Sequence, residues 1–237
     1  MITPLPSLSQ ATLIAAFLAS TTGTYIACRQ PNPNPPSSSG IRSKCDALTT
    51  YRITDKHATK VMLSPLGLLT LWTVRLAYLY PNLPSRCHLI NTDLITWSPS
   101  TAIPLALILC AGVPLRLASY ASLGKNFTFA LAEPDGLKTT GLYKYVQHPS
   151  YTGVVILIIC NVALMGRVDG VMSCWVPDQW FKYVRDLGLS LAPVGVSMVL
   201  FGVWTRVRQE EEMLRGRFGE EWERWHKNTA RFIPGIF

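Results

Sequence analysis

Five stretches of this 237-residue chain are almost free of charged side chains, and each is long enough to cross a membrane. A bilayer requires about 20 residues of apolar helix, and Arg75 is the one charged residue inside these stretches. Charged residues make up only 15% of the chain, against roughly 25% in soluble domains. A soluble fold would have to bury all five stretches in one small core. The sequence therefore predicts an all-α, polytopic membrane protein with about five transmembrane helices: Ile2–Cys28, Val61–Tyr80, Leu94–Leu115, Tyr145–Gly166 and Leu187–Thr205.

The basic residues are divided unequally between the two sides of these spans. Of the 22 Lys and Arg residues, 17 fall on the side that carries the C-terminal tail and four on the other. Because cytosolic loops carry the excess of Lys and Arg, the tail is predicted to be a cytosolic helix that extends the fifth span. The net charge of +8 needs no nucleic-acid partner, since contact with anionic membrane lipid accounts for it. The first span lacks the basic start of a secretory signal, so it is predicted to be a retained anchor.

Proline and cysteine positions refine this organisation. Pro31–Gly40 (PNPNPPSSSG) predicts a flexible cytosolic loop, and three prolines at 99, 104 and 114 predict an irregular third span. The six cysteines include no C-x-x-C pair and are scattered along the chain, so they are interpreted as small apolar residues and not as a disulfide framework or a metal site.

Polar and aromatic side chains gather at two places on the predicted cytosolic boundary. One is Gly141–Gly153, at the start of the fourth span, and the other follows the fifth span with Arg206 and Glu210. Ionisable groups at such depth are costly and usually functional. Each group also has an ordinary explanation. An i,i+4 surface pair contributes only about 0.3–0.5 kcal/mol, a His before Pro149 can bond a nearby carbonyl, and tyrosines often form an interfacial belt. A functional site is favoured over these explanations because both clusters are predicted to lie at the same membrane boundary of adjacent helices.

Four motifs follow one another in the C-terminal half of the chain. They are Leu123-Gly124-x-Asn126-Phe127, Leu137-x-x-x-Gly141-x-Tyr143, His148-Pro149-Ser150-Tyr151-x-Gly153, and Arg206-x-x-x-Glu210-Glu211-x-x-Leu214-x-x-x-Phe218-Gly219-Glu220-Glu221. In this order they resemble the isoprenylcysteine carboxyl methyltransferase family, within a wider group that includes phospholipid methyltransferases. The resemblance starts near Leu117, and the N-terminal half is similar only in being hydrophobic. It divides the chain into a transmembrane region, 1–116, and a methyltransferase core, 117–237.

The resemblance implies an enzyme of the endoplasmic reticulum membrane. It would bind S-adenosylmethionine from the cytosol and take a prenylated protein, or a small prenylcysteine-like substrate, from the bilayer. Arg206 would bind the acceptor carboxylate and act in catalysis. The implied cofactor site, which includes no metal, consists of Asp135, Gly136, Leu137, Lys138, Tyr143, His148, Pro149, Ser150, Tyr151 and Glu210. A carboxylate with a pKa near 3.5 is already ionised at neutral pH, so the chemistry requires alignment more than acid–base catalysis.

Gln147 departs from the family pattern, which usually has Arg immediately before His-Pro. If that Arg helps to bind the acceptor carboxylate, Gln147 is a substrate-binding position that has lost a charge, with Lys144 as a candidate replacement. Gln147→Arg is then predicted to raise activity on prenylcysteine. Other acceptors stay open: a terpenoid acid, or a phospholipid amine, which would need a base such as Glu210, Glu211 or His148. A nicotinamide-dependent membrane reductase lacks the supporting G-x-G-x-x-G segment, and a non-catalytic scaffold is supported only by the hydrophobic composition.

Overall fold

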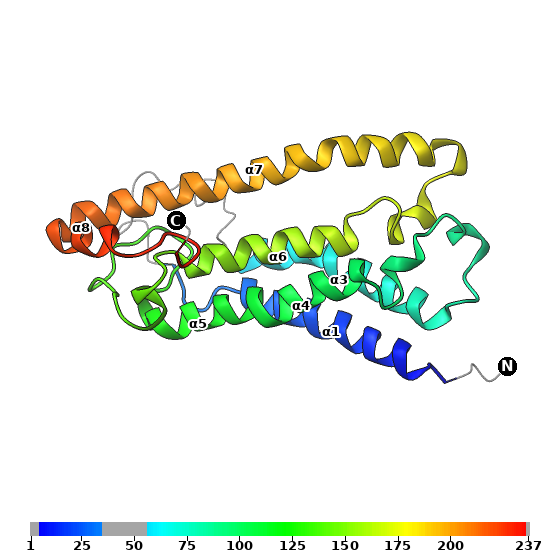
Figure 1. The fold of residues 1–237 in the computed structure, drawn as a ribbon, viewed down its shortest axis with the longest axis horizontal. Coiled ribbons are helices and arrows are strands. Elements are labelled where there is room, and N and C mark those ends of the chain that lie inside the picture. Colours follow the sequence, from blue (N-terminus) through cyan, green and yellow to red (C-terminus); the bar gives the residue numbers. More distant parts are fainter. Residues whose placement is uncertain (1–4, 35–55, 236–237) are drawn as a thin grey trace. The chain divides into compact units, whose positions relative to one another are not determined.

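A computed structural model describes residues 5–34 and 56–235, and the described residues form helices, turns and loops without a β-strand. The predicted all-α class is confirmed. The predicted loop Pro31–Gly40 lies mostly outside the described residues. The main helices are α1 (Leu8–Cys28), α3 (Lys56–Leu79), α4 (Pro99–Leu107), α5 (Val113–Leu123), α6 (Pro149–Met165), α7 (Asp178–Phe218) and α8 (Glu220–Lys227) (Figure 1).

Four helical segments are long and apolar enough to cross a membrane: Leu8–Cys28, Thr59–Leu79, Thr92–Asn126 and Asp178–Phe218. They correspond to the first, second, third and fifth predicted spans. The fourth predicted span is a shorter apolar helix, α6, of 17 residues. At 1.5 Å per residue it is about 26 Å long, slightly less than the roughly 30 Å hydrocarbon core.

The start of α6 differs from the prediction, because residues 145–148 lie outside the helix. Pro149 occupies its first turn, where a missing N–H costs nothing. The His148 carbonyl accepts from the backbone N–H groups of Tyr151 and Thr152, at 3.1 and 3.2 Å. His148 is therefore the residue at which the helix begins to form its hydrogen bonds.

The third span is irregular, as its prolines predicted. A π-helical turn, Ile108–Gly112, separates α4 from α5. Pro114 has no N–H to donate to the carbonyl four residues earlier, so the regular ladder cannot continue through this point. The helix then runs on to Leu123, eight residues beyond the predicted end at Leu115. Arg116, the residue that follows the predicted span, therefore lies within a helix.

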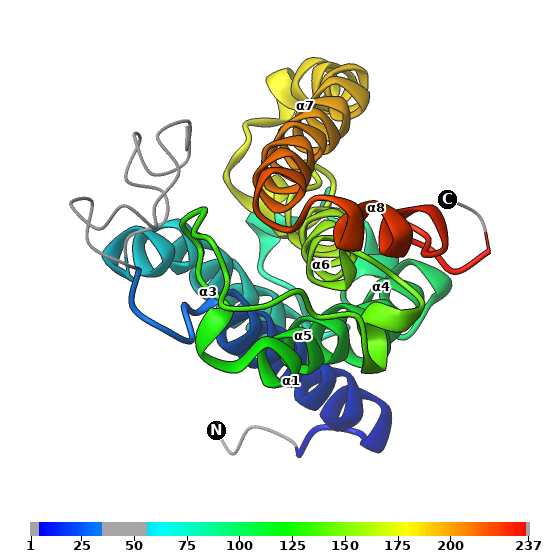
Figure 2. The ribbon, with the colours of Figure 1, turned by 90° about the vertical axis from the view of Figure 1, so that its left-hand side faces the viewer.

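The fifth predicted span continues as one helix into the charged tail, as predicted, and this helix, α7, has 41 residues (Figure 1). It ends at Phe218 and is followed by Gly219, whose φ of 51° favours glycine. The chain then changes direction into α8 (Figure 2). Val207 and Leu214 of α7 and Trp222 of α8 are buried, so these apolar side chains of the charged tail are packed within the protein.

The described chain forms two compact units, and each combines three segments. One unit consists of the described residues within Met1–Ile26, Leu63–Ala111 and Ile156–Met198, and the other of those within Ala27–Met62, Gly112–Val155 and Val199–Phe237. The predicted boundary at residue 116 is a different division, based on the resemblance alone. All the residues of both polar clusters, Gly141–Gly153 and the one with Arg206 and Glu210, belong to the second unit.

In the first unit, Cys87 and Cys174 form a disulfide between two short helical turns, Ser85–Cys87 and Val171–Trp175. The interpretation of all six cysteines as small apolar residues was therefore wrong for this pair. The partners are 87 positions apart, and no local spacing could have linked them. Cys28, Cys110 and Cys160 are free thiols, whereas Cys45 lies outside the described residues.

Candidate functional site

The C-terminal segment holds the chain that leads into α6. Val146 and Ala230 form a parallel bridge. The backbone N–H of Gln147 donates to the Ala230 carbonyl at 2.8 Å, and that of His148 donates to the Arg231 carbonyl at 2.9 Å. The C-terminal segment at residues 230–231 therefore positions the His-Pro motif, although it lies some 80 residues away in the sequence.

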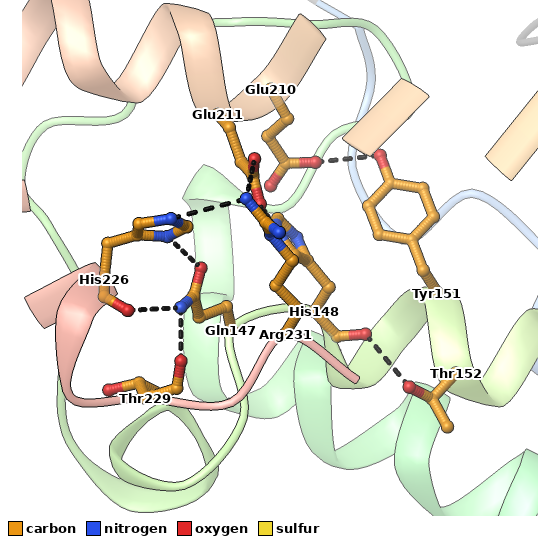
Figure 3. Close-up of polar contacts among 9 residues, drawn as sticks. All are labelled: Gln147, His148, Tyr151, Thr152, Glu210, Glu211, His226, Thr229 and Arg231. Atoms are coloured by element: carbon orange, nitrogen blue, oxygen red, sulfur yellow. Dashed lines mark hydrogen bonds and ion pairs between the residues drawn. The ribbon is translucent and has the colours of Figure 1, made fainter. Parts of the chain in front are cut away.

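Glu211 and Arg231 form the charged centre of this contact (Figure 3). Arg231 Nε and Nη2 lie 2.9 and 3.3 Å from the two carboxylate oxygens of Glu211. His148 Nε2 lies 3.3 Å from Glu211 Oε1. His148 and Glu211 are almost fully buried. The sequence-based site included His148 but neither Glu211 nor Arg231, and the adjacent Glu210-Glu211 pair was the one signal that pointed to Glu211.

Gln147 bonds to the same C-terminal segment through its side chain (Figure 3). Its amide nitrogen donates to the carbonyls of His226 and Thr229, and its Oε1 lies 2.7 Å from His226 Nδ1. Burial lowers the pKa of His226, and the charge of Arg231 lowers it further against the opposite effect of Glu211. A neutral ring that donates from Nδ1 to Gln147 can accept at Nε2 from Arg231 Nη2, 3.4 Å away.

These contacts reverse the expectation for Gln147→Arg. Arginine has no acceptor for the His226 Nδ1–H, and it adds a cation close to Arg231. We expect the variant to lose stability by about 1–3 kcal/mol, together with activity, and not to gain turnover. Thermal unfolding in detergent measures the change, with Lys144→Arg as a control at an exposed position. Higher activity at an unchanged melting temperature would contradict this role of Gln147.

Arg206, Glu210 and Tyr151 form the second part of the site. The Tyr151 hydroxyl donates to Glu210 Oε2 at 2.8 Å (Figure 3). Arg206 Nη2 donates to the Phe129 carbonyl at 2.6 Å, and the Arg206 side chain is buried. Since Arg206 is 6% exposed, it is not half of an ordinary surface pair.

Tyr143 brings the second motif, Leu137-x-x-x-Gly141-x-Tyr143, to the same place. It is buried, and its backbone carbonyl accepts from Trp225 Nε1 at 2.7 Å. Burial raises the pKa of Tyr143 above its usual range, and the charge of Glu210 raises it further. The second unit thus brings together six of the predicted residues: Tyr143, His148, Ser150, Tyr151, Arg206 and Glu210.

The predicted loop Asp135–Lys138 lies on the surface. Asp135 forms an ion pair with Lys125 at 2.8 Å, and both side chains are exposed. Gly136 faces open space. Lys144 is also exposed and contacts the Tyr145 ring, so it does not replace a charge beside the buried Gln147.

The fold and the site define an all-helical membrane protein with buried charged and aromatic groups gathered in one unit. The isoprenylcysteine carboxyl methyltransferase (ICMT) family matches residues 104–185, which include the His-Pro motif but end before Arg206. The chain is 29% identical over 133 residues to a protein-S-isoprenylcysteine O-methyltransferase of Schizosaccharomyces pombe, covering 54% of this chain and 47% of the relative. It is 26% identical over 136 residues to one of Dictyostelium discoideum, covering 55% and 48%. The resemblance to this family is confirmed, and the chain spans about half the length of the curated relatives it matches.

Proposed function

We propose that this protein transfers a methyl group from S-adenosylmethionine to the C-terminal carboxylate of a prenylated cysteine. The observation that carries this proposal is the pair of opposite charges on successive turns of α7, Arg206 and Glu210, with Glu210 bonded to Tyr151 of α6. The family match and the names of the two relatives support the same reaction.

The side chains present suit this cofactor. S-adenosylmethionine supplies an electrophilic methyl on a cationic sulfonium, and it carries an ammonium, a carboxylate and an adenine. Glu210 can pair with the ammonium, and the rings of Tyr143 and Tyr151 can face positive charge. The first turn of α6 at Ser150 can approach the carboxylate.

The residues of the site then act mainly by orientation. Arg206 can hold the acceptor carboxylate with two parallel N–H groups while one oxygen stays available to attack. Good alignment can supply about 7–11 kcal/mol of barrier reduction. The reaction requires no general base. This agrees with the structure, because the Glu211 carboxylate is already bound by Arg231 and His148.

Cofactor binding tests this assignment directly. S-adenosylmethionine should raise the melting temperature of the detergent-purified protein, and NADPH should not. Glu210→Gln should lower the affinity for S-adenosylmethionine at least tenfold. Glu212→Gln, at an exposed neighbouring position, should leave this affinity unchanged. Stabilisation by NADPH alone would favour a reductase, and equal affinity in the two variants would remove Glu210 from the cofactor site.

We further propose five membrane crossings, with α6 as the fourth, in the endoplasmic reticulum and with the tail in the cytosol. The division of basic residues supports this orientation. The disulfide supports it independently, because Cys87 and Cys174 follow α3 and α6 in segments predicted to face away from the tail. Disulfides persist in oxidising compartments such as the lumen of the endoplasmic reticulum.

The disulfide therefore predicts the behaviour of intact microsomes. Cys87→Ser should free the Cys174 thiol for alkylation by a membrane-permeant maleimide, whereas Cys110→Ser should free none, because Cys110 is already unpaired. A glycosylation tag placed after residue 237 should stay unmodified, and a tag inserted beside Cys87 should be glycosylated. The reverse pattern of glycosylation would overturn the orientation.

A further inference from the structure

Arg116 is a buried cation that neither the sequence motifs nor the proposed mechanism has used. It lies on α5, within the candidate membrane segment Thr92–Asn126, and is 7% exposed. No Asp or Glu of the described residues lies within ion-pair distance of it. Burying a charge without an opposite charge is expensive, and ionisable groups at membrane depth are usually functional.

The surroundings of Arg116 fix the guanidinium in place. Nε donates to the Ala27 carbonyl at 3.1 Å, and Nη1 donates to the Ser150 hydroxyl at 2.6 Å. The rings of Tyr120, Phe127 and Phe129 surround it, with centroids 5.0, 5.8 and 5.6 Å from the guanidinium carbon.

Gly153 brings the α6 backbone against this arginine. A Cβ atom added there would lie 2.9 Å from Arg116 Cγ and 3.0 Å from the Gly112 carbonyl oxygen. Glycine is therefore what permits the close approach of α5 and α6. Side chain and backbone together hold the guanidinium at the first turn of α6.

The Ala27 contact neutralises only part of the charge. Ala27 lies in the last turn of α1, whose unpaired carbonyls are equivalent to roughly half a negative charge, and Tyr120 donates to the same carbonyl. At its other end Arg116 meets the N-terminal turn of α6 through Ser150, where the helix dipole is positive. Two positive groups thus converge at Ser150 without an anion.

The position of Arg116 connects it to the proposed site. Its ring neighbour Phe129 provides the carbonyl that binds Arg206. Burial and Glu210 raise the pKa of Tyr143, and the charge of Arg116 acts on the same phenol in the opposite direction. Arg116, Arg206 and Glu210 therefore act on one small region of the second unit.

We infer that Arg116 is a second anion-binding residue of this site and takes a carboxylate of one of the two reactants. This inference rests on the proposed function. The carboxylate belongs either to the amino-acid part of the methyl donor or to the prenylcysteine acceptor. A buried guanidinium beside a hydroxyl and a helix N-terminus suits both.

The test compares ligands that differ only in the carboxylate. S-adenosylmethionine and its decarboxylated form are titrated into the detergent-purified wild type and Arg116→Gln, and N-acetyl-farnesylcysteine is compared with its carboxamide. If the donor carboxylate binds Arg116, Arg116→Gln lowers the affinity for S-adenosylmethionine about tenfold or more and leaves the affinity for the decarboxylated form unchanged. If the acceptor carboxylate binds there, the same pattern is seen with farnesylcysteine and its amide.

Two further variants separate binding from packing. Arg116→Lys keeps the charge and should show an intermediate loss for the same ligand. Tyr120→Phe keeps the ring but removes the other donor to the Ala27 carbonyl, so it should lower the melting temperature and change the ligand affinities less than twofold. If both Arg116 variants only lower the melting temperature and keep the wild-type preference for both carboxylates, Arg116 merely caps α1 and the inference is wrong. A wild type that binds neither S-adenosylmethionine nor farnesylcysteine instead overturns the proposed function, and the inference with it.

Discussion

Replacing Arg206 with Lys should lower the rate of methyl transfer about 100-fold or more, although the positive charge is kept. An ammonium can satisfy the Phe129 carbonyl that Arg206 now binds, but it cannot hold a carboxylate with two parallel N–H groups. Steady-state kinetics with farnesylcysteine should show the loss mainly in kcat/KM, with the affinity for S-adenosylmethionine unchanged.

Arg208→Lys is the matched control for this change. Arg208 lies two positions further along α7 and is exposed, so its replacement should leave both kinetic constants within twofold of the wild type. Wild-type kinetics in Arg206→Lys would remove Arg206 from the acceptor site.

Replacing Glu211 with Gln should cost about 3 kcal/mol of unfolding free energy. The variant keeps the shape of the side chain but leaves Arg231 without its counter-charge and His148 without its carboxylate partner. This loss of unfolding free energy should lie at the low end of the range for broken buried ion pairs, because the Arg231 side chain is 22% exposed. Denaturant unfolding in mixed micelles, followed by tryptophan fluorescence, measures the change, and Glu212→Gln is the exposed control.

A double-mutant cycle separates this pair from a general loss of packing. Arg231→Gln in the Glu211→Gln background should cost at least 1 kcal/mol less than Arg231→Gln in the wild type. Additive losses would mean that Glu211 and Arg231 stabilise the fold independently.

The sequence predicted the helical class and most spans because charge is excluded from a membrane core, and long runs without charge are visible in one dimension. Its errors arose where distant segments decide the structure. The start of α6 depends on Ala230 and Arg231 of the tail, a segment with no periodic pattern. The Cys87–Cys174 disulfide depends on a contact across 87 positions.

The grouping of some candidate site residues could likewise be predicted from the sequence. His148, Tyr151, Arg206 and Glu210 belong to motifs whose order can be read along the chain, and the structure brings them into one unit. The partners of Gln147 could not be inferred from its neighbours in sequence, since they come from residues 226–230.

Transfer of a labelled methyl group tests the central claim most directly. Purified protein in lipid vesicles is incubated with methyl-labelled S-adenosylmethionine and, separately, with farnesylcysteine, geranylgeranylcysteine, phosphatidylethanolamine and a terpenoid acid. We expect label on the two prenylcysteines as a base-labile ester, none on the lipid amine, and transfer slower by about 100-fold or more with Arg206→Lys. Label appearing on phosphatidylethanolamine while both prenylcysteines stay unlabelled would contradict the account.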